Sequence, residues 1–181
     1  MKLRPLWFLL FLLLYGMQMI AQNRQADSLY VFSLINKAED HFTESNYDSA
    51  LYYCGLAHSY SQAKNFRKGQ AYSQIETTDI YIDKEDLAKA NATAESVIKI
   101  GQQTKDSLVT AIGWMQQAQV QMYSDHYDAA VILFDKSLQL YLGKHPTRYS
   151  ALAYNDLGYT WGRKGELSKQ AECLVKSIAI Y

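Results

Sequence analysis

Apolar and small side chains recur along this chain with a period of 40 residues. The second half of each period opens on a tyrosine or leucine, at Tyr47, Leu87, Tyr127 and Leu167. Apolar or small residues follow three, seven and ten positions later, at Ala50, Cys54, Ala57, Ala90, Ala94, Val97, Ala130, Phe134, Ser137, Leu174 and Ser177. Such spacings place side chains on one face of a helix. The return of this face at a fixed period predicts an array of helical repeats.

Each period is predicted to contain two helices joined by a short turn. The repeats are expected at about 27–64, 65–104, 106–143 and 146–181, and a truncated last repeat remains an alternative. The first helices of the four pairs also share a small residue at a spacing of 40, at Ala38, Thr78, Ala118 and Gly158. A small side chain lets the paired helix approach closely, so these positions are expected where the two helices of a pair cross.

The connections between the helices carry residues that favour turns and caps. Turns are expected at Ser45-Asn46, Asp125-His126 and Gly165-Glu166, and Asp106 is expected to cap the helix after it. Gly143 is expected to end a helix and Pro146 to stand in the first turn of the next. In the last pair Gln170 stands where the other three repeats have an alanine, and Ala171 comes one residue later. A local adjustment of the packing is therefore expected there.

The N-terminus has the pattern of an export signal. Lys2 and Arg4 precede a charge-free apolar run of 12 residues at 6–17, which is short for a membrane span of about 20 residues. Ala21 offers a small residue for cleavage. Residues 1–21 are therefore predicted to be a signal peptide that exports 22–181 to the periplasm, and an uncleaved N-terminal membrane anchor is the alternative.

Two cysteines, Cys54 and Cys173, are the only thiols of the chain. An exported protein can form disulfides. These two lie three repeats apart, however, and repeats that advance by ~10 Å each would separate them by about 30 Å. A disulfide needs Cα atoms within about 7 Å, so both are expected to be free thiols in the core.

Charge and motifs limit the chemistry that the chain could perform. The 18 basic and 18 acidic residues leave 16 and 18 after Lys2 and Arg4 are set aside, a net charge of −2 with no basic block for nucleic acid. The histidines, His41, His58, His126 and His145, lack the spacing of metal ligands. No nucleophile–base arrangement or phosphate loop is readable, and the segment 162–165 reads as a turn. We expect no catalytic residue, no cofactor and no metal.

The repeat pattern resembles the tetratricopeptide repeat (TPR) family. Tyr154, Leu157, Gly158 and Trp161 match the aromatic, Leu-Gly and aromatic positions of its first helix. On the second helix Tyr127, Ala130, Phe134 and Ser137 match best, and Tyr47, Ala50 and Ala57 follow the same pattern. The resemblance covers about 27–181 and implies an all-α fold, a right-handed superhelical solenoid of about four antiparallel helix pairs.

In this family the first helices line an inner groove that binds peptides or proteins. The resemblance implies that the groove consists of Phe32, Ile35, Glu39, Phe42, Tyr72, Ile75, Asp79, Asp83, Met115, Gln119, Met122, Tyr123, Asn155, Tyr159 and Arg163. Aromatic rings, methionines and a few charges suit a peptide-binding surface. The alternative is that several of these side chains pack against neighbouring helices. The family's clamp for C-terminal carboxylates needs lysines and asparagines, and the acidic and apolar side chains here do not favour it.

Exported arrays with 40-residue repeats resemble the periplasmic N-terminal regions of bacterial TPR-containing sensor histidine kinases and regulators. The sequence ends on Ile178-Ala179-Ile180-Tyr181, without a polar cap, so self-association through the last helix is expected. The favoured function is an exported interaction module for a protein or peptide, as the sensory or scaffold region of a larger signalling protein whose kinase domain would follow residue 181. The alternative is a free-standing periplasmic scaffold for envelope protein assembly.

Overall fold

The structure of this chain is a computed structural model that describes residues 4–141 and 147–180, with side chains from residue 23 onward. Within these ranges it forms eight α-helices and no strand. The helices are α1 (Arg4–Thr43), α2 (Tyr47–Ala63), α3 (Arg67–Asp83), α4 (Leu87–Thr104), α5 (Ser107–Tyr123), α6 (Tyr127–Tyr141), α7 (Arg148–Arg163) and α8 (Leu167–Ile178). The predicted all-α class is confirmed, and helices α2 to α8 begin and end close to the predicted positions. Gly143 and Pro146 lie outside the described residues.

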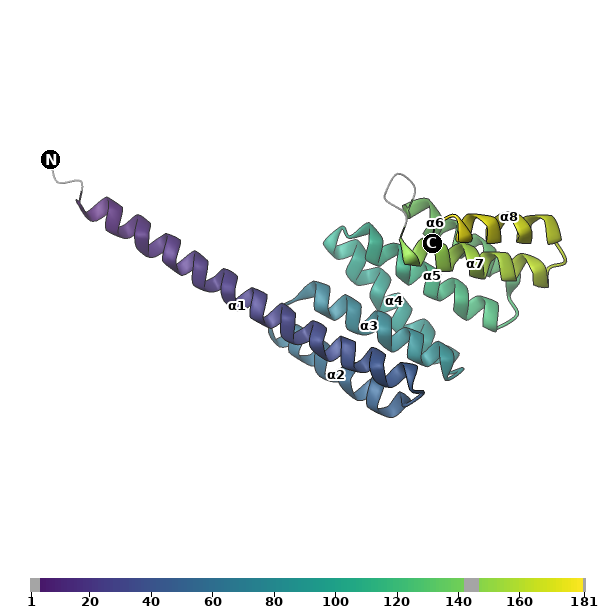
Figure 1. The fold of residues 1–181 in the computed structure, drawn as a ribbon, viewed down its shortest axis with the longest axis horizontal. Helices are drawn as coiled ribbons and strands as arrows, with labels where there is room; N and C mark the ends of the chain where they lie inside the picture. Colours follow the sequence, from purple (N-terminus) through teal and green to yellow (C-terminus); the bar gives the residue numbers. More distant parts are fainter. Residues whose placement is uncertain (1–3, 142–146, 181) are drawn as a thin grey trace.

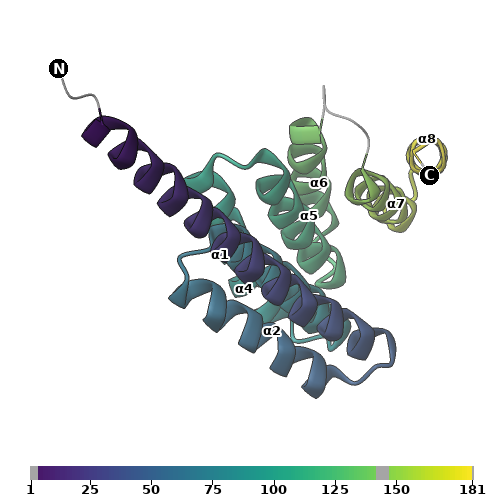
Figure 2. The same ribbon diagram turned by 60° about the vertical axis from the view of Figure 1, so that its left-hand side comes forward.

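The helices pack in chain order as four antiparallel pairs (Figure 1). The first helices of successive pairs also contact one another, α1 with α3, α3 with α5 and α5 with α7. By contrast, α2, α4, α6 and α8 contact only their neighbours in the sequence, over the described residues. Figure 2 shows the pair α7 and α8 at one end of the stack and α1 with α2 at the other. The odd-numbered helices α1, α3, α5 and α7 therefore form one continuous face, termed the inner face, which can line a groove.

In each described turn between helices, a residue with left-handed backbone conformation follows the end of the preceding helix. These residues lie 20 positions apart, or 40 where the intervening turn is outside the described residues. These residues are Ser45, Asn65, Glu85, Lys105, Asp125 and Gly165. In each turn the left-handed residue donates its N–H to the carbonyl three residues earlier, and the next residue donates to the carbonyl five residues before it. This is the Schellman motif, which satisfies the last carbonyls of a helix. The 40-residue repeat is thus built from two similar units of helix and turn.

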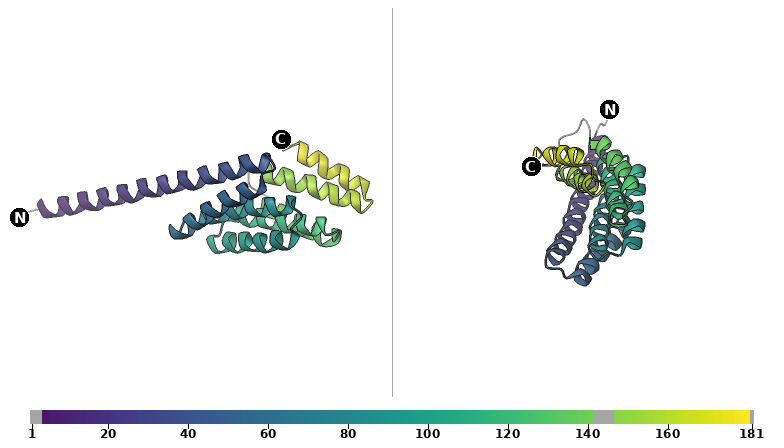
Figure 3. Two further views of the ribbon diagram at one scale, coloured as in Figure 1. Left: turned by 90° about the horizontal axis from the view of Figure 1, so that it is seen from below. Right: turned by 90° about the vertical axis from the view of Figure 1, so that its right-hand side faces the viewer.

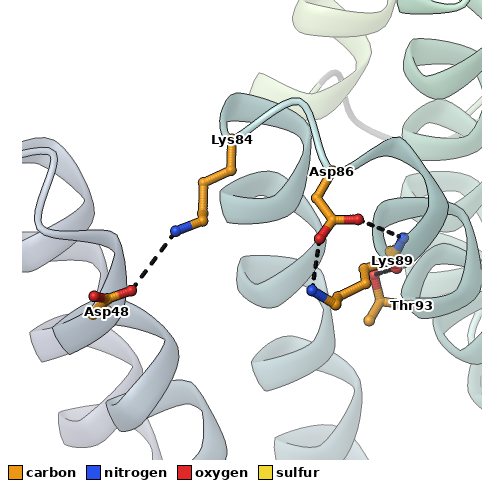
Figure 4. A network of polar contacts seen from close by, with 5 residues as sticks. All are labelled: Asp48, Lys84, Asp86, Lys89 and Thr93. Carbon is orange, nitrogen blue, oxygen red and sulfur yellow. Dashed lines mark hydrogen bonds and ion pairs between the residues drawn. The ribbon is translucent and has the colours of Figure 1, made fainter.

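Side-chain caps fix several helix starts. The Asp106 carboxylate accepts hydrogen bonds from the backbone N–H groups of Leu108 and Val109, which confirms its predicted role as a cap. Figure 4 shows the equivalent cap in the preceding pair, where Asp86 accepts from the backbone and from the ammonium of Lys89. In the same view Lys84, which follows α3, forms an ion pair with Asp48 of α2 and so links the first two repeats.

The positions with a 40-residue period form the contact between paired helices. Every predicted small position from Ala38 to Gly158 is buried, as are the alanines from Ala50 to Ala130. At the last small position, the hydroxyl of Ser137 donates to the Ala111 carbonyl at 2.7 Å. The Ser177 hydroxyl donates in the same way to Ala151 at 2.8 Å. These buried hydroxyls are satisfied by the backbone of the partner helix, which explains why serine replaces the apolar residues of the first two repeats.

The expected adjustment in the last pair occurs where α7 crosses α8. The Gln170 side chain lies so close to Gly162 that a Cβ on this glycine would be 2.7 Å from the Gln170 amide. Gly158 also lies close to the carbonyl of Gln170. The larger glutamine is therefore accommodated because glycine faces it on the partner helix.

Helix α1 begins much earlier than the expected start near Asp27. Figure 3 shows it extending far beyond the repeat stack. No proline or glycine interrupts the chain between residues 17 and 43, so nothing in this stretch ends a helix. Over the part of the chain that the structure describes, no helix is long and apolar enough to cross a membrane. Cys54 and Cys173 are both free and buried, as predicted.

Candidate functional site

The structure divides the predicted groove residues into three groups by exposure. Four of them are buried in the core, namely Ile35, Ile75, Met115 and Met122. Five are exposed, namely Asp83, Tyr123, Asn155, Tyr159 and Arg163. Six are half-buried, namely Phe32, Glu39, Phe42, Tyr72, Asp79 and Gln119. The buried group follows the alternative interpretation, in which side chains of the first helices pack against neighbouring helices.

Five predicted residues lie around one cavity of about 200 Å³ on the inner face. They are Phe42 of α1, Asp79 and Asp83 of α3, and Met115 and Gln119 of α5. The cavity is completed by Ile82 and by three residues near the start of α7, Arg148, Tyr149 and Leu152. The odd-numbered helices thus bring side chains from all four repeats to a single site.

The other predicted residues are not part of the cavity wall, although Glu39 lies 3.9 Å from Arg148 in that wall. Phe32 and Tyr72 form an aromatic contact between α1 and α3, with ring centroids 5.7 Å apart. At the opposite end of the helices, Arg163 donates a hydrogen bond to the Tyr159 hydroxyl and lies 3.6 Å from the Asp125 carboxylate. These contacts join neighbouring turns and helices, whereas the cavity gathers residues from every repeat.

Carboxylates dominate the electrostatics of the inner face. Glu76 is only 9% exposed and has no hydrogen-bond partner among the described residues. Burial raises the pKa of Glu76 to about 8, and the nearby carboxylates Asp79 and Glu39 add to this effect. Burial also raises the pKa of Asp79 to about 6, against the effect of a hydrogen bond from Gln116. The face therefore holds carboxyl groups whose pKa values are raised by burial, and the charge of Arg148 opposes this effect on Glu76 and Asp79.

Two glutamines of α5 hold the carboxylates of the neighbouring first helices. Gln116 donates from Nε2 to Asp79 at 2.7 Å and to the Ile75 carbonyl at 3.0 Å. One turn later Gln119 donates to Asp156 of α7 at 2.8 Å. The Oε1 atoms of both glutamines are buried and accept no hydrogen bond within the described part. These amides fix the carboxylates in place and leave acceptor oxygens, so the site is suited to donor groups.

Sequence reasoning missed Glu76, Arg148 and Tyr149. Glu76 lies next to the predicted Ile75 and gave no separate signal. The positions equivalent to the other two, one repeat earlier, are Leu108 and Val109, which belong to the core region. The 40-residue period therefore predicts packing at the start of α7 and carries no sign of a polar group that reaches the groove.

A second cavity of about 420 Å³ lies between α6, α7 and α8. Tyr154, Trp161 and Cys173 lie in its wall together with charged residues, and the ammonium of Lys169 stands 4.2 Å from the Trp161 ring centroid. Burial raises the pKa of the Cys173 thiol, which lowers its reactivity. Over the described residues no group of three or more His, Cys, Asp or Glu side chains is arranged to hold a metal.

Comparison of the sequence with protein-family models finds no match, and a search of curated proteins finds no relative.

Proposed function

We propose that this chain is an exported interaction module of the TPR type that binds a segment of a partner protein on its inner face. In this proposal the repeats wind into a right-handed superhelix, residues 1–21 direct export to the periplasm, and 22–181 act as the sensory or scaffold region of a larger signalling protein. A free-standing periplasmic scaffold is the alternative. The gene sequence after codon 181 separates the two, because only the first requires a membrane helix and an output domain.

Three structural features support the repeat assignment. The helices form antiparallel pairs with small residues at the crossings. First helices contact first helices, while second helices stay apart over the described residues. Such stacking produces an extended concave surface, which repeat proteins use for binding.

The observation that carries the proposed function is the acidic cavity on that surface. Asp79 and Asp83 line it and Glu39 lies close by on the same face, while Glu76, whose pKa is raised to about 8, holds its proton at neutral pH. Complementary charge steers a partner to its site and selects against partners of the same charge. The partner segment is therefore expected to carry positive side chains, with apolar ones for the wall formed by Phe42 and Leu152.

Fluorescence anisotropy with labelled peptides tests this proposal. The purified protein should bind a peptide of alternating arginine and tyrosine, and should not bind the same peptide with glutamate in place of arginine. Binding should weaken as salt is raised, because part of the acidic surface is exposed. The variant Asp83→Asn should bind about tenfold more weakly.

Glu95→Gln on α4 is the matched control, since Glu95 is exposed and lies on a second helix. It removes one negative charge away from the inner face and should leave the affinity unchanged. Equal losses in both variants, or no preference for the arginine peptide, would overturn the proposed function.

A further inference from the structure

The first turn of α7 places a cationic and an aromatic side chain at the acidic cavity. Arg148 Nη1 lies 3.9 Å from Glu39 Oε1, so a residue of the fourth repeat reaches a residue of the first. The backbones of α1 and α7 are not in contact. Figure 1 shows α3 and α5 between them. The Arg148 side chain therefore spans the inner face.

Tyr149 completes this arrangement. Its ring is half-buried in the wall of the cavity, and the Arg148 guanidinium lies 5.1 Å from the ring centroid. Burial raises the pKa of Tyr149 to about 12, and the charges of Glu76 and Asp79 of α3 add to this effect against that of Arg148. An arginine stacked on a tyrosine thus covers the part of α3 that carries the buried carboxylates.

We propose that Arg148 and Tyr149 are an internal occupant of the inner groove, which a partner displaces with its own arginine and aromatic side chains. This inference rests on the proposed function and adds the chemistry of the ligand and its regulation. It is carried by the position of the pair and by the nine-tenths buried Glu76, which lacks a hydrogen-bond donor among the described residues.

The contacts of the pair are suited to displacement. The Arg148 and Glu39 side chains are 61% and 47% exposed, so water competes for both charges and the ion pair is weak. Tyr149 packs against the core, and its phenol interacts with the neighbouring Arg148 guanidinium, so the two side chains can leave the cavity together. A partner that supplies the same two groups would replace these contacts with similar ones and would also gain the surface they uncover.

The test compares affinities for the same arginine–tyrosine peptide in variants of the full chain. Arg148→Gln/Tyr149→Ala should bind it about tenfold more tightly than the unmodified protein, since the groove no longer has to open first. Lys99→Gln, which removes an exposed positive charge of α4, should bind as the unmodified protein does. Circular dichroism melting of each variant shows whether the helices are retained.

A second measurement follows the groove without any peptide. Spin labels on cysteines at the exposed positions Asp40 of α1 and Asn155 of α7 report the distance between the first and fourth repeats. In Arg148→Gln this distance should lengthen or broaden, and in Lys99→Gln it should not. An unchanged distance together with unchanged peptide affinity would refute the internal occupant while leaving the proposed function intact. Absence of peptide binding by every protein would overturn both.

Discussion

At the scale of single residues, the inner face contains carboxyl groups whose burial lowers the stability of the fold. Glu76 and Asp79 are neighbours on one face of α3, and both have pKa values above those of exposed carboxyls. Gln116 satisfies one of them, and the other has no donor among the described residues. A protein that keeps such groups sacrifices stability, which is common where a surface is kept ready for a ligand.

The Glu76 carboxyl should make stability depend on pH. Its pKa is about 8 in the folded protein and near 4.3 in an unfolded chain, so between these values the folded state holds a proton that the unfolded state has released. The unfolding free energy should therefore fall as pH rises from about 5 to 8. Glu76→Gln stays neutral and should be more stable than the unmodified protein at pH 8, by ~1–3 kcal/mol, with a smaller difference at pH 5.

Urea unfolding at pH 5, 7 and 8.5, chosen as roughly spanning the two pKa values, checks this expectation. Asp79 and Asp156 also have raised pKa values, so the unfolding free energy of Glu76→Gln should still depend on pH, but less steeply. The exposed Glu95→Gln should keep the full slope. The same pH dependence in the Glu76→Gln variant would show that Glu76 is ionised and solvated in the folded protein.

At the scale of helices, the positions of most helices and turns could be predicted from the sequence. The small residues at the crossings and the turn residues at the ends are local signals, and α2 to α8 follow them closely. The start of α1 was missed, because a signal peptide was expected to be separate from the first repeat and no helix-ending residue lies between them. The 20-residue recurrence of left-handed residues was also missed, since side chains as different as Ser45, Glu85 and Lys105 occupy that conformation.

Helix α8 presents an apolar strip that predicts self-association. Leu167, Val175 and Ile178 are 70%, 66% and 74% exposed and share one side of the helix. Leu174, on the neighbouring side, is half-buried beside Gly158, and Tyr181 lies outside the described residues. We expect the protein to dimerise at micromolar concentrations through this strip, because an apolar surface of this kind favours association.

Sedimentation velocity of Val175→Gln/Ile178→Gln tests the role of α8. The double variant should be monomeric, with helical content unchanged, since neither side chain is buried. Ile132→Gln on α6 removes a single side chain of similar exposure, 67%, and should still dimerise. A monomeric unmodified protein would show that the strip is covered or too small to drive association.

At the scale of the whole molecule, the four repeats bring side chains distant in sequence to one cavity. The resemblance to the TPR family implied which helices line the inner face, and five of the residues that it implied line the cavity. It could not predict Arg148 and Tyr149, because their positions in the repeat are occupied elsewhere by core residues. Nor could it separate lining residues such as Asp79 from buried ones such as Ile75, since exposure depends on how closely the first helices pack.

The central claim is that a partner binds on the face formed by α1, α3, α5 and α7. Its most direct test is photo-crosslinking of an arginine–tyrosine peptide that carries a benzoylphenylalanine beside one arginine, followed by mass spectrometry of the joined residues. Crosslinks should fall around the cavity, on residues such as Phe42, Asp83, Gln119 and Leu152, and excess unlabelled peptide should abolish them. Crosslinks concentrated on α2, α4, α6 or α8 would contradict the account.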